Sequence, residues 1–211
     1  SCNRGKRVSD RVAIFIDGSN LYHSLEENCK RFDLDFGAFA RKLCSNRTLV
    51  RVYYYNIRQD QNMKPQAYQD QQGFLAVLEN TPLLEVRLGI SKIRGDVLVE
   101  KGIDVMIATD LLEFGRTNMY DIAILVSGDG DFAYALGAIK NMGKYAEVAA
   151  FYSNLAPELA RIADERHVLN PNFFRDLWKG HRRRYPGRRP GRRPSPTTPA
   201  SHPDKPTTRS S

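Results

Sequence analysis

Cysteine is scarce in this 211-residue chain, and the three that occur, Cys2, Cys29 and Cys44, form no CxxC pair. An odd number at these spacings argues against a disulfide framework and a zinc site, and indicates a reducing compartment. Long apolar runs are also missing: no stretch approaches the ~20 residues that cross a bilayer. Residues 1–11 are polar and basic, without the apolar segment of a signal peptide. We therefore expect a cytoplasmic protein.

A charge excess is missing from most of the chain as well. The formal net charge is +8, from 32 Lys and Arg against 24 Asp and Glu. Residues 181–211 hold nine of the basic residues and one acidic residue, so this segment carries the entire excess. The rest of the chain is neutral, so the net charge as a nucleic-acid signal belongs to the C-terminal segment.

The C-terminal segment differs from the rest in composition. From about Gly180 the chain consists mainly of Arg, Pro, Gly, Ser and Thr, which cannot bury enough apolar surface to offset the entropy of ordering. We expect a flexible N-terminus over residues 1–10, one domain over 11–178 and a disordered basic tail over 179–211. Nucleic-acid binding through counterion release is the favoured role of the tail, with a solvated charge run or an anionic-membrane contact as alternatives. The arginines concerned are Arg182, Arg183, Arg184, Arg188, Arg189, Arg192 and Arg193.

The domain itself shows the pattern of a parallel α/β sheet. Hydrophobic residues make up 41% of the sequence, and apolar runs bounded by turn signals alternate with longer periodic segments. Strands are expected over residues 12–16, 49–57, 84–88, 121–126 and 146–151, with a hairpin or edge strand over 93–100. Helices are expected over residues 20–27, 36–43, 64–79, 103–114, 132–141 and 157–165. The 103–114 helix is apolar on nearly every side and is predicted to be largely buried.

Aspartates follow the two strands that should lie at the centre of this sheet. Asp17 comes directly after residues 12–16, and the sequence Ser-Gly-Asp-Gly-Asp at 127–131 follows residues 121–126. Ligands of open α/β sheets bind at the carboxyl ends of the strands, so adjacent strands would bring Asp17, Asp129 and Asp131 together. Carboxylates ~4 Å apart repel by about 4 kcal/mol at an effective dielectric near 20, and a divalent cation offsets this cost. Oxygen ligands of this kind indicate Mg²⁺ or Mn²⁺.

Asp104 is a fourth candidate for this site. It lies near the start of the 103–114 helix among apolar neighbours, where a carboxylate is costly unless it lies at the edge of a site or has a partner. Lys101, three residues earlier, could be that partner or could contact a phosphate. Asp110 points roughly 120° away from Asp104 on a helix and is expected to group with Glu113 on an outer face.

Other interpretations of these aspartates remain open. An aspartate after a strand can cap a helix, and Asp-Gly pairs occur in ordinary turns. Residues 128–133 fit the form G-x-G-x-x-A of a dinucleotide-binding loop, but two aspartates there would repel a pyrophosphate and no ribose-binding acid follows the next strand. An aspartyl-phosphate phosphotransferase would want a second aspartate two positions after Asp17, where Ser19 stands.

Three segments together resemble the NYN domain family, particularly its LabA-like branch. They are residues 15–20 (Phe-Ile-Asp-Gly-Ser-Asn), residues 101–104 (Lys-Gly-Ile-Asp) with Asp110, and residues 125–132 (Leu-Val-Ser-Gly-Asp-Gly-Asp-Phe). The resemblance covers about residues 10–170. It implies a PIN-like, Rossmann-related α/β sandwich with an acidic cluster that binds a divalent metal and, in active members, cleaves RNA.

The resemblance also implies roles for individual residues. The acidic positions of the family are matched by Asp17, Asp104, Asp129 and Asp131. Asn20 matches a polar residue that positions the first aspartate or a water, and Ser127 matches a residue that supports the second loop. Lys101 and Asp110 match family positions too.

The sequence therefore favours an enzyme, a Mg²⁺- or Mn²⁺-dependent endoribonuclease that hydrolyses RNA phosphodiester bonds at the aspartate cluster. The alternative is an RNA-binding or regulatory module that keeps the acidic pocket but turns over little or nothing. DNA stays an alternative substrate because nothing in the sequence identifies a 2′-OH contact. The sequence gives no indication of oligomeric state.

Overall fold

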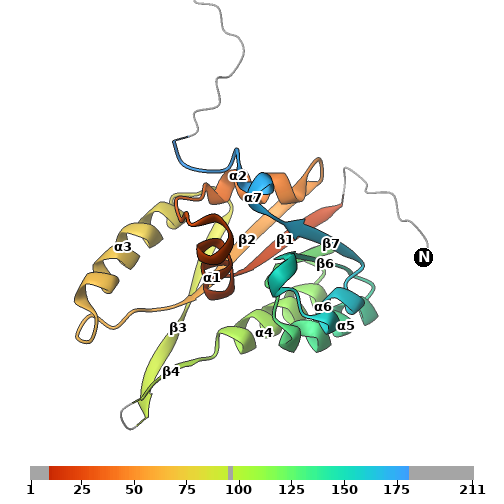
Figure 1. Cartoon of the computed structure of the whole chain (residues 1–211). Coiled ribbons are helices and arrows are strands. Elements are labelled where there is room, and N and C mark those ends of the chain that lie inside the picture. The colour runs from red at the N-terminus through yellow and green to blue at the C-terminus, as the bar shows by residue number, and fades with distance from the viewer. Residues whose placement is uncertain (1–9, 95–96, 181–211) are drawn as a thin grey trace, which may run out of the picture. The chain divides into compact units, whose positions relative to one another are not determined.

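A computed structural model of the protein describes residues 10–94 and 97–180, without the side chains of residues 91–101. The predicted N-terminal extension and most of the basic tail lie outside these residues. Seven strands form one sheet in the order β4-β3-β2-β1-β5-β6-β7, and helices cover both of its faces (Figure 1). The predicted α/β sandwich of Rossmann-like, PIN-like type is confirmed for this part of the chain.

Six of the strands run parallel, and β4 pairs antiparallel with β3 as a hairpin at one edge. The strands are β1 (Arg11–Asp17), β2 (Thr48–Ile57), β3 (Leu84–Arg94), β4 (Val97–Lys101), β5 (Ile122–Val126), β6 (Tyr145–Phe151) and β7 (Glu165–Leu169). The two apolar strands β1 and β5 lie at the centre, where continuous Val, Ile, Leu, Ala and Phe residues are covered on both faces.

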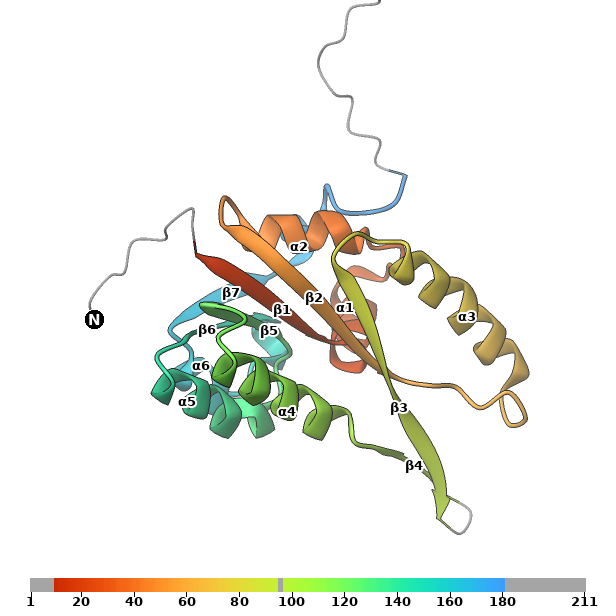
Figure 2. The same cartoon turned by 180° about the vertical axis from the view of Figure 1, so that it is seen from behind.

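Alternate residues of β1 face two separate cores. Val12, Ile14 and Ile16 pack with α1, α2, α3 and α7, whereas Ala13 and Phe15 pack with α4, α5 and α6. The first group is α1 (Gly18–Cys29), α2 (Phe36–Cys44), α3 (Pro65–Glu79) and α7 (Pro171–Phe174). The second is α4 (Ile103–Arg116), α5 (Ala133–Asn141) and α6 (Pro157–Ile162), with α4 and α5 in front of the sheet in Figure 2. Two short 3₁₀ helices, η1 (Gly130–Phe132) and η2 (Tyr152–Asn154), follow β5 and β6.

Helix α4 is less buried than the sequence predicts. Only Ile107, Leu111 and Gly115 are buried in it, and Val105 is 69% exposed. The expectation of a largely buried helix was wrong because α4 belongs to an outer layer, where a single stripe of the helix faces the sheet. The apolar residues outside that stripe remain accessible.

The region after β6 also differs from the prediction. The single helix expected over residues 157–165 ends at Ile162, and β7 then adds a strand beside β6. His167 on β7 lies 2.7 Å from Glu147 on β6, and Arg47 forms an ion pair with the same buried carboxylate. Burial alone would raise the pKa of Glu147, but its bonds to His167 and Arg47 outweigh burial and hold the pKa below its usual value.

Candidate active site

The carboxyl ends of β1 and β5 meet where the order of the sheet reverses. The two strands are parallel neighbours, with Ile16 opposite Val126. The chain passes from β1 to α1 on one face and from β5 to α5 on the other, which is the position where open α/β sheets bind their ligands. Asp17 ends β1 and Ser127 follows β5 directly, so the structure brings the two predicted loops to the same edge of the sheet.

Asp17 is the buried residue of the site, with 6% of its surface exposed. Its Oδ1 accepts the backbone N–H of Asn20 at 3.1 Å, which caps α1, and its Oδ2 accepts the hydroxyl of Ser127 at 3.2 Å. Burial is the main cause that raises the pKa of Asp17, and the charges of Asp104 and Asp129 raise it further against these two bonds. The carboxylate is thus fixed in position while its negative charge is poorly compensated.

The loop after β5 is tied to the loop after β1 by short polar contacts. Ser127 Oγ accepts the N–H of Asp129 at 3.2 Å, and Asp129 Oδ1 accepts the N–H of Asp131 at 3.0 Å. The side chain of Asn20 accepts the N–H of Gly128 at 3.1 Å. Asn20 therefore contacts Asp17 through its backbone and the second loop through its amide oxygen.

Gly128 allows a close approach that a larger residue would block. A Cβ at this position would lie 2.0 Å from the carbonyl oxygen of Asn154, which ends η2. The N–H of Ala156 also donates to the Gly128 carbonyl at 2.9 Å. Because both contacts involve backbone atoms, the loop that carries Asp129 is fixed against the connection between β6 and α6.

The same connection places a carboxylate that sequence reasoning missed. A Cβ built on Gly130 would lie 3.5 Å from Glu158 Oε2, so Glu158 in the first turn of α6 lies beside the aspartate loop. The signal in the sequence was the acidic residue after Pro157, at the start of a helix that follows a parallel strand. A helix in this position begins at the carboxyl edge of the sheet.

Asp104 reaches the site from α4. It is the second residue of that helix. The helix follows Gly102, whose φ of +95° makes the turn from β4. Its side chain is exposed, yet nearby atoms partly desolvate the carboxylate and raise its pKa, and the charges of Asp129 and Asp131 raise it further. This electrostatic coupling places Asp104 in the same acidic group as the two loops.

Asp110 lies apart from the aspartates of the site. Its carboxylate accepts the Tyr55 hydroxyl at 2.7 Å and forms an ion pair with Arg87. The expected grouping with Glu113 on an outer face was wrong, because Glu113 pairs with Arg116 instead. Asp110 faces β2 and β3, and its contacts hold α4 against the sheet. Through these contacts it helps to position the helix that carries Asp104.

The side chain of Lys101 and the tail arginines lie outside the described residues. Lys101 ends β4 opposite Ile90, but its side chain lies outside the described residues. The same holds for the whole of the predicted nucleic-acid-binding set, Arg182, Arg183, Arg184, Arg188, Arg189, Arg192 and Arg193.

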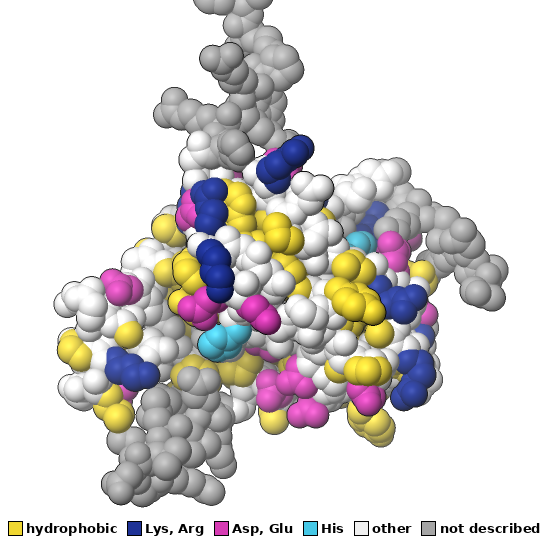
Figure 3. Space-filling view, in the orientation of Figure 1, with side chains coloured by type: hydrophobic (Ala, Val, Ile, Leu, Met, Phe, Trp, Pro, Cys, Tyr) yellow, Lys and Arg dark blue, Asp and Glu magenta, His cyan; other side chains and the backbone are white. Residues whose placement is uncertain are grey.

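The acidic group has the chemistry of a divalent-cation site. The atoms that it offers to a metal are all carboxylate oxygens. Within the described residues, none of its four members forms an ion pair with Lys or Arg; they are Asp17, Asp104, Asp129 and Asp131. Across the described part of the chain, however, no three His, Cys, Asp or Glu side chains already surround a single point as metal ligands. Carboxylate oxygens are the ligands that Mg²⁺ prefers in proteins. Figure 3 shows acidic side chains gathered along the lower edge of the molecule.

The family comparison supports a ribonuclease-type α/β domain. We call the group formed by Asp17, Asp104, Asp129 and Asp131 the acidic edge. The NYN domain family matches residues 11–170, and the chain belongs to this family. It is 29% identical, over 177 residues, to the low amplitude and bright protein LabA of Synechococcus elongatus. The matched region covers 76% of this chain and 84% of LabA. A Vibrio parahaemolyticus protein of unknown function has the same fold, with a TM-score of 0.67 at 24% identity over 80% of this chain and 98% of its own. No helix among the described residues has the length and hydrophobicity to span a membrane.

Proposed function

We propose that this protein is a Mg²⁺- or Mn²⁺-dependent endoribonuclease that hydrolyses RNA phosphodiester bonds at the acidic edge. One observation carries the proposal: four aspartates from three separate segments gather near the carboxyl ends of β1 and β5. Burial is the main cause that raises the pKa of Asp17 and of Asp104; the charges of Asp104 and Asp129 raise that of Asp17 further, and those of Asp129 and Asp131 raise that of Asp104 further. Such uncompensated charge costs stability, and binding of a cation explains why the sequence contains it.

The four aspartates differ in how tightly they are held. Asp17 is fixed by two hydrogen bonds and Asp129 by one, so these two form the rigid part of the ligand set. Asp104 and Asp131 are exposed and can adjust to an incoming phosphate. A bound Mg²⁺ or Mn²⁺ would supply charge neutralisation, a water with a lowered pKa and stabilisation of the leaving oxygen. Asn20 and Ser127 keep the two loops in register.

The dinucleotide-binding alternative has less support. In such a loop the glycines leave space for a pyrophosphate beside the backbone. Here the space beside Gly128 is filled by the Asn154 carbonyl, and Asp129 and Asp131 add negative charge on either side of Gly130. A dinucleotide phosphate would meet both a steric and an electrostatic barrier.

An RNA-binding module with little turnover is the second candidate, and an exposed aromatic residue favours it. Tyr152 on η2 is 83% exposed. Aromatic rings at this exposure stack on unpaired bases. Tyr152 follows β6, which lies parallel beside β5, so its ring fits an RNA surface at this edge of the sheet with or without cleavage.

The test is cleavage of single-stranded RNA by an Asp129→Asn, Asp131→Asn double variant in Mn²⁺ or Mg²⁺. We expect metal-dependent cleavage by the wild type and its loss in the variant. Asp60→Asn is a matched control, because Asp60 also accepts backbone N–H groups two and three residues ahead in a turn. Cleavage that persists in the double variant would refute the nuclease proposal. RNA binding without cleavage by any of the three proteins would support the binding module.

A further inference from the structure

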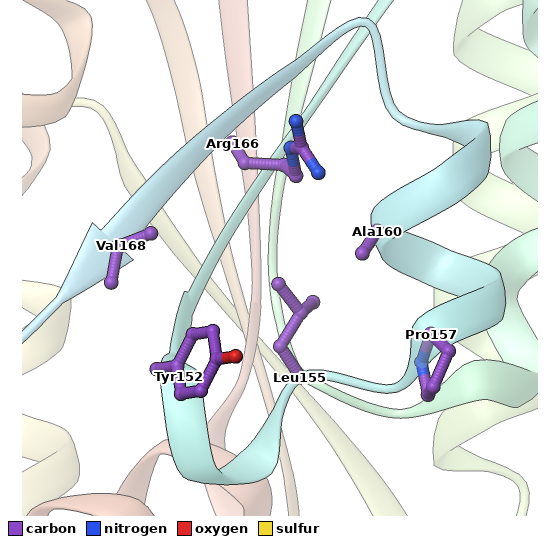
Figure 4. A pocket seen from close by; sticks show the side chains of 6 residues that line it. All are labelled: Tyr152, Leu155, Pro157, Ala160, Arg166 and Val168. Carbon is purple, nitrogen blue, oxygen red and sulfur yellow. The ribbon is translucent and has the colours of Figure 1, made fainter.

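A half-open groove lies beside the acidic edge, between β7 and α6. It encloses about 530 Å³, within the range of small-ligand sites. Its lining residues are Tyr152, Leu155, Pro157, Ala160, Arg166 and Val168. Figure 4 shows Leu155 at the centre, the Tyr152 ring beside it and the Arg166 side chain extending from β7 toward α6.

The groove combines an apolar floor with one aromatic ring and one cation. Tyr152 is 83% exposed and Val168 is 49% exposed, so both present apolar surface to water. Arg166 is exposed as well, and among the described residues its guanidinium has neither an ion pair nor a hydrogen bond. An aromatic ring beside an unpaired arginine matches a nucleotide, whose base stacks and whose phosphate binds guanidinium.

The groove and the acidic edge share a wall. Leu155 and Pro157 line the groove on either side of Ala156, whose N–H donates to the carbonyl of Gly128 at 2.9 Å. A Cβ on Gly130 would lie 3.2 Å from the Ala156 side chain. An RNA strand bound at Asp129 thus needs to pass over only the short connection at residues 155–157 to enter the groove.

We propose that the groove is a nucleotide subsite that binds the base adjacent to the cleaved phosphate in single-stranded RNA. Tyr152 stacks on that base, Leu155 and Val168 cover its apolar edges, and Arg166 binds the flanking phosphate. The acidic edge repels phosphates, so a cation at the next position helps to keep the strand in place. Because the base must leave its own stack to enter, the subsite selects unpaired RNA. The assignment rests on the proposed function, since the cleaved phosphate defines the position of the subsite.

The experiment measures the affinity of the full chain for a short single-stranded RNA, with EDTA present so that no strand is cut. Tyr152→Ala should weaken binding about tenfold, the strength of one base–aromatic stack, and Tyr152→Phe should retain wild-type affinity. Tyr134→Ala removes an equally exposed tyrosine outside the groove and should bind as the wild type does. For the cation, Arg166→Gln should weaken binding more than Arg161→Gln, a change at an exposed arginine on α6 outside the lining.

An abasic scan of the RNA identifies the base concerned. Removal of one base should weaken binding to the wild type and leave binding to Tyr152→Ala unchanged. Equal losses for Tyr152→Ala and Tyr134→Ala, or no loss for either, would overturn the subsite, even if the aspartate variants show that the nuclease proposal is correct. Conversely, a specific loss for Tyr152→Ala in a protein that cuts no RNA would support the groove as a base-binding site and overturn only the nuclease proposal.

Discussion

Replacing one carboxylate of the acidic edge should change stability in opposite directions with and without metal. Asp104→Asn is the clearest variant, because Asp104 makes no side-chain hydrogen bond within the described residues. Folding raises the pKa of Asp104, so its ionised form destabilises the folded state at neutral pH. In EDTA the variant should therefore be more stable than the wild type. The side chain is exposed, so solvent screening limits the gain to about 0.5 kcal/mol, or ~1–2 °C in Tm.

A divalent cation should reverse this order. At a metal concentration ~100 times Kd, binding stabilises the wild type by about 2.7 kcal/mol, which raises Tm by roughly 5–10 °C for a chain of this size. Loss of one ligand should weaken binding ~100-fold, which leaves the variant a gain of about 0.4 kcal/mol. The wild type then becomes the more stable protein.

The assay is differential scanning calorimetry at pH 7 in EDTA, Mg²⁺ and Mn²⁺, with NaCl added to equal ionic strength. Asp70→Asn on α3 serves as the control, since it removes an exposed aspartate outside the acidic edge. It should gain as much from metal as the wild type. Equal metal-induced shifts in Asp104→Asn and the wild type, or no shift in the wild type, would refute the assignment of Asp104 to a metal site.

Three further predictions concern the loop, the core and the tail. Gly128→Ala should destabilise the protein by ~1–3 kcal/mol in chemical denaturation and abolish cleavage, because its Cβ would lie 2.0 Å from a backbone oxygen, whereas Gly73→Ala, with open space around it, should not. Folding lowers the pKa of Glu147, so its carboxylate stabilises the fold above the unfolded pKa of about 4.5, and this stability should be lost as the pH falls below that value. Glu147→Gln should remove this pH dependence in acid unfolding and should lower the free energy of unfolding by ~3–5 kcal/mol at pH 7. Deleting residues 181–211 should weaken RNA binding and reduce its salt dependence in fluorescence titrations but leave metal-dependent cleavage; unchanged salt dependence would contradict a role for the tail arginines.

The central strands and their aspartates are accessible from sequence because their signals are local. The apolar runs before Asp17 and Ser127 have no polar alternation, and the glycines that follow mark sharp turns. Pairing of β1 with β5 is not local: the sequence made it a condition for bringing the aspartates together, and the structure shows the pairing. Asp104 was a candidate because a carboxylate among apolar neighbours is costly away from a site edge or a partner, and the resemblance then matched it to an acidic position of the family.

What the sequence did not reveal depends on partners distant in the chain. β7 has polar residues at three of its five positions, so no apolar run marks it in the sequence, and it pairs with β6, where His167 contacts the buried Glu147. Asp110 was assigned to an outer face because its partner Arg87 lies on β3, 23 residues earlier. The groove at Tyr152 is formed by a 3₁₀ turn, the start of α6 and the edge strand β7, and of these only the start of α6 was predicted from the sequence.

Cleavage of labelled single-stranded RNA by Asp17→Asn tests the central claim most directly. Asp35→Asn is the matched control, because Asp35 caps α2 through the same bond, to the N–H three residues ahead, with which Asp17 caps α1. We predict cleavage in Mg²⁺ or Mn²⁺ by the wild type and Asp35→Asn, no cleavage in EDTA, and a loss of ~100-fold or more in Asp17→Asn. Equal cleavage by the two variants, or cleavage that continues in EDTA, would contradict a metal-dependent site at the ends of β1 and β5.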